Sequence, residues 1–352
     1  MAIIFAILLF SFLIFIHELG HFVAAKLSGI QVNEFSIFMG PAIFKKQVGE
    51  TLYAIRCIPI GGYCAMEGED QDTDNPRSFR AAKWWKRLIV LIAGSFMNFV
   101  VGVLLVAIVL FWQPSYVKPQ VTAIEQWSTV DTGNGLQVGD TILEFNGEKI
   151  LVYEDFSLAT IFLPDGNYDI LVERNGQQVF LEDVLMERHS VLNTSGETVR
   201  LYGLNFSRVT NTPQSVPGRI LPTAFNHFKS VIVSLKMLFT GQASVGDMTG
   251  PVGIVTYMAD IAEQSAPEYA LMNLLSFGAA IAINLAVMNM LPIPALDGGR
   301  AVGLLLTTAV EKVTKKKVNS KVEGYIHGVG MVLLLILMAV VMFKDVFMLF
   351  KG

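Results

Sequence analysis

Four long apolar stretches with almost no charge constrain the fold of this chain more than any other feature. They cover residues 1–16, 88–112, 269–296 and 324–343. They contain no Asp, Glu, Lys or Arg, and His327 is their only histidine. A helix needs about 20 apolar residues to cross the hydrocarbon core of a bilayer. The last three stretches reach that length alone, and the first reaches it if the helix continues to about Lys26. We therefore expect a multi-pass α-helical membrane protein with four transmembrane helices.

The composition agrees with this fold class and excludes others. Of the 352 residues, 53% are hydrophobic and 16% are charged, whereas soluble globular chains carry about 25% charged residues. Thirty acidic and 26 basic side chains give a net charge of −4, so the basic signature of a nucleic-acid-binding protein is absent. Two cysteines are too few for a disulfide scaffold. We expect the lipid bilayer, and no nucleic acid, as a partner.

The distribution of Lys and Arg predicts the side of the membrane on which each loop lies, because cytoplasmic loops are enriched in these residues. Residues 26–87 carry nine of them and residues 300–321 carry six, which assigns both segments to the cytoplasm. Residues 117–268 carry nine Lys or Arg against eighteen Asp or Glu, which assigns this segment to the outside. Four spans alternate correctly with these assignments if the amino terminus is outside. A cleaved signal peptide is the alternative for residues 1–16, but it would begin with positive charge.

The external segment is expected to contain one small β-rich domain. Alternating residues closed by Asn146-Gly147, and a hairpin signal at Asn175-Gly176, indicate antiparallel strands. The expected segments are a first transmembrane helix at 1–27, a cytoplasmic β-loop segment at 28–87, a second transmembrane helix at 88–113, the β-rich domain at 117–208, an amphipathic and glycine-rich external region at 209–268, a third transmembrane helix at 269–299, a basic cytoplasmic loop at 300–323, and a fourth transmembrane helix at 324–347.

The first apolar segment ends in His17-Glu18-Leu19-Gly20-His21, an H-E-x-x-H motif. On a helix, residues i and i+4 lie on one face about 6 Å apart along the axis, so the two imidazoles can share one tetrahedral Zn²⁺. Glu18 lies about 100° around the helix from His17, which suits a base that takes a proton from the metal-bound water. Chance is the alternative, but ionisable residues at membrane depth are costly unless they are paired or liganded. The motif therefore predicts a buried metal site.

A catalytic zinc site needs a third protein ligand and leaves one position for water. The candidates are Glu34, Glu67, Asp297 and His327. Asp297 is favoured because it follows a 28-residue uncharged stretch and so lies near the membrane. Pro292 and Pro294 break the helix before it, and Gly298-Gly299 relax the backbone after it. A broken helix at membrane depth is tolerated only where it lines a protein cavity or water. The alternative for Asp297 is a helix-capping carboxylate.

Together the two motifs resemble the site-2 protease family of intramembrane zinc metalloproteases, most closely the bacterial regulator-of-sigma-E protease type. The resemblance rests on His17–His21 and on Asn289-x-x-Pro292-x-Pro294-x-Leu296-Asp297-Gly298. Three further stretches are similar to that type: Gly61-Gly62-Tyr63 after the first span, Leu136-Gln137-Val138-Gly139-Asp140 with Asn146-Gly147, which looks like a PDZ domain, and Gly250-Pro251-Val252-Gly253-Ile254 after it.

The resemblance implies one zinc ion per chain, bound by His17, His21 and Asp297, with Glu18 as the base. It also implies that Asn289 and Asn284 hold the substrate backbone, although a helix–helix hydrogen bond is an equal alternative for Asn284. The full set of expected substrate-binding residues is Asn284, Asn289, Pro292, Pro294, Gly61 and Gly62.

Residues 31–64 contain short apolar runs separated by Gly40-Pro41 and Gly61-Gly62. We hypothesise a membrane-associated β-loop that dips into the bilayer beside the zinc and offers a strand edge to the unwound substrate. The alternative is a cytoplasmic hairpin that rests on the bilayer surface, because exposed strand edges are not tolerated in lipid.

The sequence therefore predicts an intramembrane zinc metalloprotease. The resemblance implies a bacterial inner membrane, an external amino terminus and an inserted extracytoplasmic PDZ-like domain, an active site near the cytoplasmic side, and single-span membrane proteins as substrates, such as anti-sigma factors or remnant signal peptides. The PDZ-like domain would bind a peptide or act as a size filter. Two alternatives are a non-catalytic PDZ-containing adaptor and a metal or proton transporter. Neither explains a glutamate between two histidines at metal-binding spacing.

Overall fold

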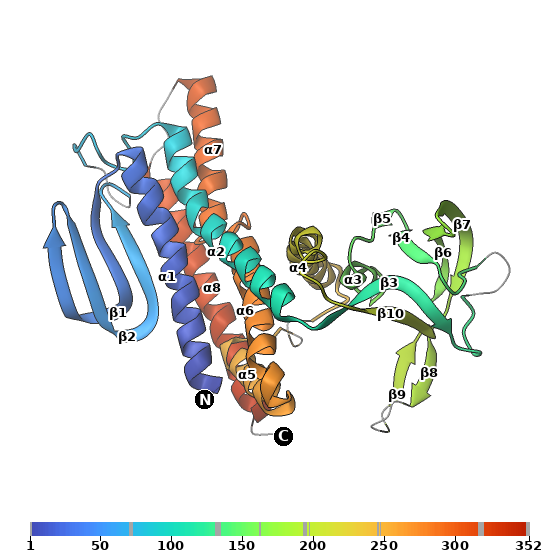
Figure 1. Cartoon of the computed structure of the whole chain (residues 1–352). Helices are drawn as coiled ribbons and strands as arrows, with labels where there is room; N and C mark the ends of the chain where they lie inside the picture. The colour runs from blue at the N-terminus through green and yellow to red at the C-terminus, as the bar shows by residue number, and fades with distance from the viewer. Residues whose placement is uncertain are drawn as a thin grey trace. The chain divides into compact units, whose positions relative to one another are not determined.

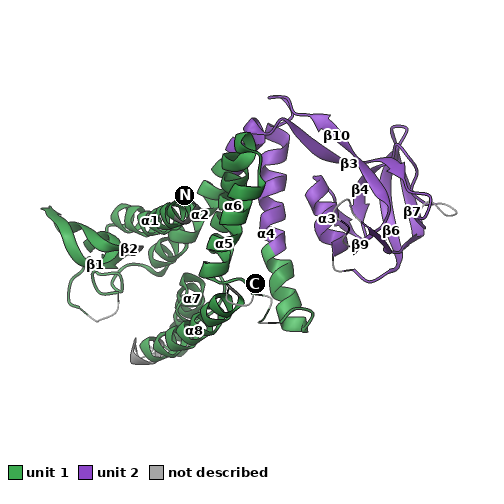
Figure 2. Ribbon diagram, turned by 90° about the horizontal axis from the view of Figure 1, so that it is seen from below, with its two compact units in different colours: residues 1–105, 231–352 green, residues 106–230 purple. Residues whose placement is uncertain are grey.

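The protein folds into two compact units, as seen in a computed structural model (Figure 1). The structure describes residues 2–69, 73–130, 135–161, 163–192, 196, 198–244, 246, 248–315 and 320–349. The first unit comprises residues 1–105 and 231–352, and the second comprises residues 106–230 (Figure 2). Each unit has its own hydrophobic cluster, so each is described by itself.

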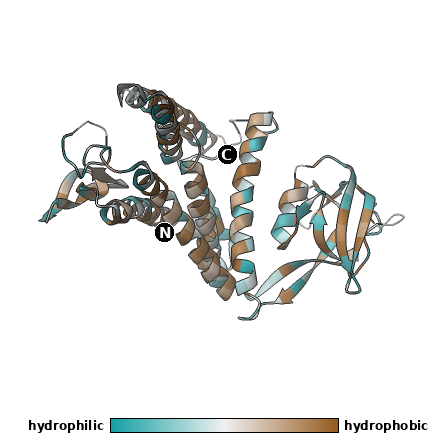
Figure 3. Ribbon diagram, turned by 90° about the horizontal axis from the view of Figure 1, so that it is seen from above, coloured by the Kyte–Doolittle hydropathy of each residue, from teal (hydrophilic) through white to brown (hydrophobic). Residues whose placement is uncertain are grey.

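Four helices are long and apolar enough to cross a bilayer, and they are largely brown in the hydropathy colouring of Figure 3. They are α1 (Ala2–Ser28), α2 (Trp84–Trp112), α6 (Pro267–Asn289) and α8 (Ser320–Leu349). At 1.5 Å per residue, each exceeds the roughly 30 Å thickness of the hydrocarbon core. The prediction of four membrane-length helices is confirmed. The apolar window of α6 is 44% buried and that of α8 is 11% buried, so α8 is the outermost of the four.

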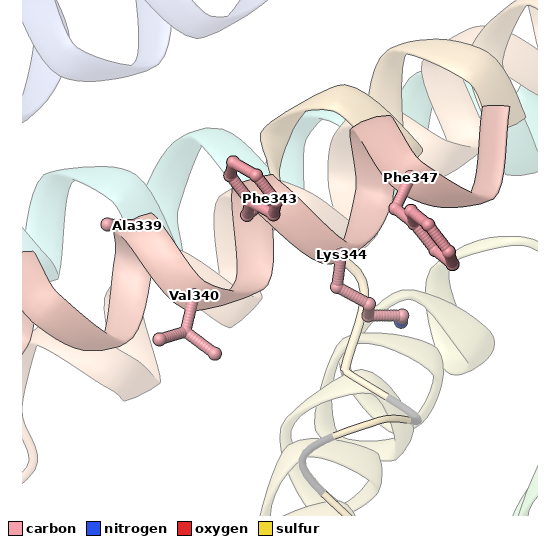
Figure 4. Close-up of a pocket in the computed structure, with 5 residues that line it drawn as sticks. All are labelled: Ala339, Val340, Phe343, Lys344 and Phe347. Carbon is pink, nitrogen blue, oxygen red and sulfur yellow. The ribbon is translucent and has the colours of Figure 1, made fainter. Parts of the chain in front are cut away.

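The exposed face of α8 carries a shallow hollow of about 550 Å³ near its carboxyl end. Its lining residues are Ala339, Val340, Phe343, Lys344 and Phe347 (Figure 4). The ammonium of Lys344 donates a hydrogen bond to the Met248 carbonyl, and the rest of the lining is apolar. This mostly apolar surface suits contact with lipid chains.

The region after the third long helix differs from the prediction. The third span was expected to run over residues 269–299, but α6 ends at Asn289, and a second helix, α7 (Asp297–Thr314), occupies most of the expected basic loop at 300–323. The charge pattern predicts the side of the membrane on which this segment lies, but it does not predict the conformation of the segment. The segment is helical because apolar residues at helical spacing, such as Ala301 and Leu304, bury one face of α7. Lys316 and Lys317 of the basic cluster lie outside the described residues.

The predicted β-loop segment forms a hairpin that folds back on itself. Its strands are β1 (Val32–Val48) and β2 (Thr51–Met66). Residues 44–48 pair with 51–55, whereas residues 34–37 pair with 52–55 on one side and with 62–65 on the other. The first half of β1 is therefore central, and residues 62–65 lie at an edge of this small sheet.

Arg56 neutralises and crosslinks the interior of this hairpin. Its guanidinium donates hydrogen bonds to Glu34 Oε1 at 2.6 Å, to the Tyr63 hydroxyl at 2.7 Å and to Ser36 Oγ at 3.0 Å. The outer half of the hairpin exposes apolar side chains, namely Met39, Ile43, Phe44, Val48, Ile55 and Ile58. A satisfied internal charge and an apolar exterior are properties that a membrane-associated sheet requires.

An ion-pair network joins the turn of the hairpin to the neighbouring elements. Glu50 accepts hydrogen bonds from Arg77 at 2.6 Å and from Lys26 at 2.8 Å. The Arg77 guanidinium, followed by the Lys26 ammonium, lowers the pKa of Glu50 to about 2. Glu50 therefore stays ionised at physiological pH and ties the turn to the end of α1.

A hydrophobic cluster surrounds the carboxyl-terminal half of α1. It unites Ala25 of α1, Phe35 of β1, Val90 of α2 and Leu304 of α7, with further residues of the same elements. Gly20 allows α1 and α2 to approach closely, because a Cβ at this position would lie 2.4 Å from the Ala93 carbonyl oxygen. The end of α1 that carries the H-E-x-x-H motif is thus held from three sides.

The second unit is β-rich, as predicted. Its elements are β3 (Ser115–Ile124), β4 (Thr141–Phe145), β5 (Glu148–Lys149), α3 (Tyr153–Ile161), β6 (Gly166–Arg174), β7 (Gln177–Met186), β8 (His189–Leu192), β9 (Thr198–Leu201) and β10 (Leu204–Thr210). One sheet has the order β10-β3-β4-β6-β7, with β5 paired to β4, and β8 pairs with β9. Ile142, Phe145 and Ile170 are fully buried in its core. The buried Asp140 carboxylate accepts two hydrogen bonds from Arg174 at 2.7 Å.

Two helices follow the sheet domain. The helix α4 (Pro217–Thr240) begins in the second unit and ends in the first, and α5 (Pro251–Gln264) lies in the first unit. The N-cap residue of α5, Gly250, supplies no capping side chain. Instead, the buried Asp345 of α8 accepts a hydrogen bond from the Gly253 amide at 2.8 Å. The negative charge stabilises the amino end of α5 and anchors it to α8.

Candidate metal centre

The helix α1 presents His17 and His21 one turn apart on the same face. Their ring centroids are 4.8 Å apart and their planes cross at 86°. Their Nε2 atoms are 3.2 Å apart. The helix continues for about two turns beyond His21 and ends at Ser28, because the next residue, Gly29, has a φ of 77°. Both imidazoles are thus fixed on a regular helix rather than at a frayed end.

The third group of the cluster is Asp297, the first residue of α7. Its Oδ2 atom lies 3.0 Å from His17 Nε2 and 3.3 Å from His21 Nε2. The described part of the chain contains one such cluster of metal-ligand side chains, and it consists of these three residues. Sequence positions 17 and 297 therefore meet at one point, as the two motifs predicted.

The geometry of these three atoms fits a zinc ion. Donors that bind a tetrahedral zinc at 2.0–2.1 Å lie about 3.3 Å from one another. The three separations, 3.0, 3.2 and 3.3 Å, are close to that value. Asp297 Oδ2 is also buried, and it faces the Nε2 atoms of the two histidines. A buried carboxylate oxygen is stabilised by a cation, and two imidazoles with one carboxylate are a ligand set that zinc prefers.

The helix α2 lies against the outer side of the two histidines. His21 Nδ1 is 2.7 Å from the Val90 carbonyl oxygen, which can only accept a hydrogen bond. This contact places the ring proton on Nδ1 and leaves the Nε2 lone pair for the metal. One turn later, Gly94 leaves space for both rings, because a Cβ there would lie 2.4 Å from His21 Nε2 and 2.8 Å from His17 Cε1.

Glu18 lies beside the cluster but is not part of it. Its side chain is half-buried, and its Cγ lies 3.7 Å from the position that a Cβ on Gly62 would occupy. The edge of the hairpin thus reaches the expected base. This arrangement brings Gly62, one of the expected substrate-binding residues, next to the H-E-x-x-H motif.

The chain between α6 and α7 is the break that the two prolines predicted. Ala295 has a φ of +83°, a left-handed conformation that costs a non-glycine residue free energy. His327 Nδ1 of α8 accepts a hydrogen bond from the Ala295 amide at 3.3 Å. Gly298 permits the turn, because its Cβ would lie 2.2 Å from the Met290 carbonyl oxygen. These contacts position the start of α7, and with it Asp297.

Three candidates for the third ligand lie elsewhere. Glu34 pairs with Arg56 inside the hairpin, Glu67 accepts a hydrogen bond from Asn33 at 2.6 Å, and His327 contacts Ala295. None of them belongs to the metal-ligand cluster found in the described residues. Asp297 is the candidate that the structure brings to the histidines.

The two expected substrate asparagines are placed differently. Asn289, at the end of α6, has its amide nitrogen 3.5 Å from His17 Nδ1. Asn284 is exposed, and five residues of helix place it about 140° around α6 from Asn289. The structure therefore brings Asn289, but not Asn284, to the histidines.

The sequence analysis did not identify the contribution of α2. Val90, Gly94 and Asn98 follow one another at intervals of four residues along the face that meets the histidines. A usable signal was present, because Asn98 is the only amide side chain in the uncharged stretch 88–112. A lone amide at membrane depth indicates a partner.

Comparison with known proteins identifies the family. The profile of peptidase family M50 matches residues 5–337. The chain belongs to peptidase family M50. Among similar proteins, a Clostridium perfringens protein that carries the provisional name of a zinc metalloprotease is 36% identical over 351 residues, covering 98% of both chains. The zinc metalloprotease RasP of Geobacillus kaustophilus is 27% identical, covering 97% of this chain and 96% of its own. The regulator of sigma-W protease RasP of Bacillus subtilis is 26% identical, covering 98% of both.

Proposed function

We propose that this M50 chain is an intramembrane zinc metalloprotease that hydrolyses a peptide bond within or near the transmembrane segment of single-span membrane proteins. The observation that carries the proposal is the convergence of His17, His21 and Asp297 at separations that fit one zinc ion. The names of the relatives, which include zinc metalloprotease RasP, support the same chemistry. We assign one zinc ion to each chain.

The three ligands leave a fourth position for water and substrate. A zinc ion held by the three ligands would supply the Lewis-acid charge that activates water and polarises the scissile carbonyl group. Glu18 would accept the proton from the attacking water and deliver it to the leaving amine. Its place next to the ligands, without being one of them, supports this role.

A membrane-spanning helix hides its peptide bonds in its own hydrogen bonds, so the substrate must unwind before cleavage. The edge formed by residues 62–65 pairs with 34–37 and with no other described strand. We propose that an unwound substrate adds to this edge as a further strand, close to Glu18. Asn289 and the break at Pro292 and Pro294 would also contact the substrate.

The sheet domain of the second unit is proposed to be an extracytoplasmic PDZ-like domain. Its similarity to PDZ domains rests on Leu136–Asp140 and the Asn146-Gly147 turn. A role as a peptide-binding domain or size filter, in a bacterial inner membrane with the active site near the cytoplasmic side, follows from the same resemblance. Substrates would then be anti-sigma factors or remnant signal peptides whose external part has already been removed.

The test is cleavage of a single-span substrate by the purified full-length chain and its Glu18→Gln variant. We expect the variant to retain zinc and to lose about 10²–10⁴-fold in cleavage rate, because a positioned base contributes that much. Glu67→Gln, which changes a carboxylate outside the metal cluster, is the matched control and should cleave at the wild-type rate. Equal cleavage by wild type and Glu18→Gln would contradict the proposal, and unaltered function in the cell without cleavage would favour an adaptor.

A further inference from the structure

We propose that Asn98 of α2 is a positioning residue that accepts the Nδ1 hydrogen of His17 and thereby aims its Nε2 at the metal. The inference rests on the proposed metal centre. It assigns to Asn98 a role in orienting His17, although α2 itself contributes no metal ligand.

Each of the two histidines needs a hydrogen-bond acceptor for its Nδ1, the ring nitrogen that does not bind the metal. A histidine that binds a metal through Nε2 carries its proton on Nδ1, and that N–H is almost always donated to an acceptor. His21 meets this requirement through the Val90 carbonyl oxygen. His17 needs an acceptor of its own.

Two side-chain amides face His17 Nδ1 at 3.5 Å. One belongs to Asn98 and the other to Asn289. In both, the nitrogen of the amide is the atom directed at the ring. Two N–H groups cannot share a hydrogen bond, so this orientation is incompatible with metal on Nε2. The oxygen and nitrogen of an amide exchange places when the group turns by about 180°, and the hydrogen-bond network decides which is correct.

Burial favours Asn98 as the acceptor. Its side chain is 1% exposed, and its Oδ1 is buried with no hydrogen-bond partner in the described part of the chain. Turning the amide directs that oxygen at the His17 N–H. Asn289 is only half-buried and lies at the end of α6, where the chain opens into the break.

The packing of α2 against α1 supports the same assignment. Along α2, Val90 meets His21, Gly94 meets both rings and Asn98 meets His17, so the two helices run antiparallel with their contacts in register. One face of α2 thus supplies both outer hydrogen bonds and the space between them. Asn289 is then free to bind the substrate backbone.

The test is zinc affinity, measured by chelator competition on the purified full-length chain. We expect Asn98→Leu to weaken zinc binding about 10–100-fold, as is typical when the outer partner of a histidine ligand is lost. Asn98→Asp keeps an acceptor and should bind zinc at least as tightly as wild type. Asn289→Leu is the matched control, since it removes the other amide; it should leave zinc affinity unchanged and raise the KM for the substrate.

Asn98→Ser serves as a second variant if Asn98→Leu does not fold, because its polar side chain is too short to reach His17. Wild-type affinity in Asn98→Leu or Asn98→Ser would overturn the inference, as would an equal loss in Asn289→Leu or no rescue in Asn98→Asp. These outcomes leave the metal centre itself intact. Failure of the wild-type chain to bind zinc at His17, His21 and Asp297 would instead overturn the proposed function.

Discussion

At the scale of single residues, the metal centre depends on two glycines without side chains as much as on the three ligands. Gly20 and Gly94 allow α1 and α2 to approach until the histidine rings touch the α2 backbone. Any side chain at these positions would occupy the space of a ring or of a carbonyl group. The ligands are therefore held by the packing of two apolar helices as well as by their own helix.

Gly94→Ala should abolish zinc binding. The added Cβ would lie 2.4 Å from His21 Nε2, so the ring must leave its position. Gly102→Ala on the same helix is the control: it places a Cβ 2.5 Å from Ile283 Cγ1, far along α2 from the histidines, and should keep its zinc. Zinc content of the two purified variants is the measurement. Full zinc occupancy in Gly94→Ala would show that the rings do not lie against α2 as described.

The cluster of the three proposed ligands was predictable from the sequence, because a helical spacing of four and a proline-broken segment each have a definite geometric meaning. Asp297 could be favoured over Glu34, Glu67 and His327 because it follows both a long uncharged stretch and a proline-broken segment. The sequence could indicate that Asn98 has a partner but not that the partner is His17, since contacts between two helices depend on their rotation and offset, which no local pattern states. The same limit applies to Asn284, whose exposure depends on how α6 is rotated.

At the scale of elements, the break between α6 and α7 decides where the carboxylate lies. The helix α8 supports it through the His327 contact with Ala295 and through Gly330, where a Cβ would lie 2.3 Å from Pro294 Cβ. The outermost long helix is thus a brace for the metal centre, although it contributes no ligand.

Gly330→Ala should displace α8 from the break and weaken zinc binding. Helix propensity favours alanine over glycine by about 1 kcal/mol, but overpacking typically costs about 1–3 kcal/mol, so the clash with Pro294 should prevail. Gly328→Ala, two residues away on α8, has nothing within 4 Å of its Cβ and should be neutral or stabilising. Zinc affinity and thermal stability of both variants measure the effect. A stabilised Gly330→Ala with normal zinc affinity would contradict the bracing role.

The helices that cross the membrane were predictable because length and lack of charge suffice for them. The helix α7 was not recognised, since its basic residues predict the side of the membrane but do not reveal that one face packs against the core through Ala301 and Leu304. The pairing of residues 34–37 with two different parts of β2 could not be predicted either. A strand that lies between two parts of one partner strand has no distinct sequence pattern.

At the scale of the whole molecule, the metal centre and the sheet domain are separate units. His17, His21 and Asp297 belong to the first unit. The second unit is an insertion in the sequence of the first, and the chain enters and leaves its sheet along two neighbouring strands. Ser115 pairs with Thr210, and the Asn211 amide donates to the Pro114 carbonyl at 2.9 Å. The two ends of the insertion therefore lie side by side.

Replacing residues 116–209 by a short Gly-Ser linker should leave the metal centre intact, because the linker joins ends that are already adjacent. We expect zinc content equal to that of the full chain. If the sheet domain is a size filter, the shortened chain should also cleave a substrate that keeps a bulky external domain faster than the full chain does. Loss of zinc on deletion would show that the first unit depends on the second.

The central claim is that one zinc ion is bound by His17, His21 and Asp297, and X-ray absorption at the zinc edge of the purified full-length chain tests it most directly. The account predicts one zinc per chain with two imidazoles and further nitrogen or oxygen donors at about 2.0–2.1 Å, and loss of the metal in Asp297→Ala. A sulfur donor from Cys57 or Cys64, or an unchanged spectrum in Asp297→Ala, would contradict it.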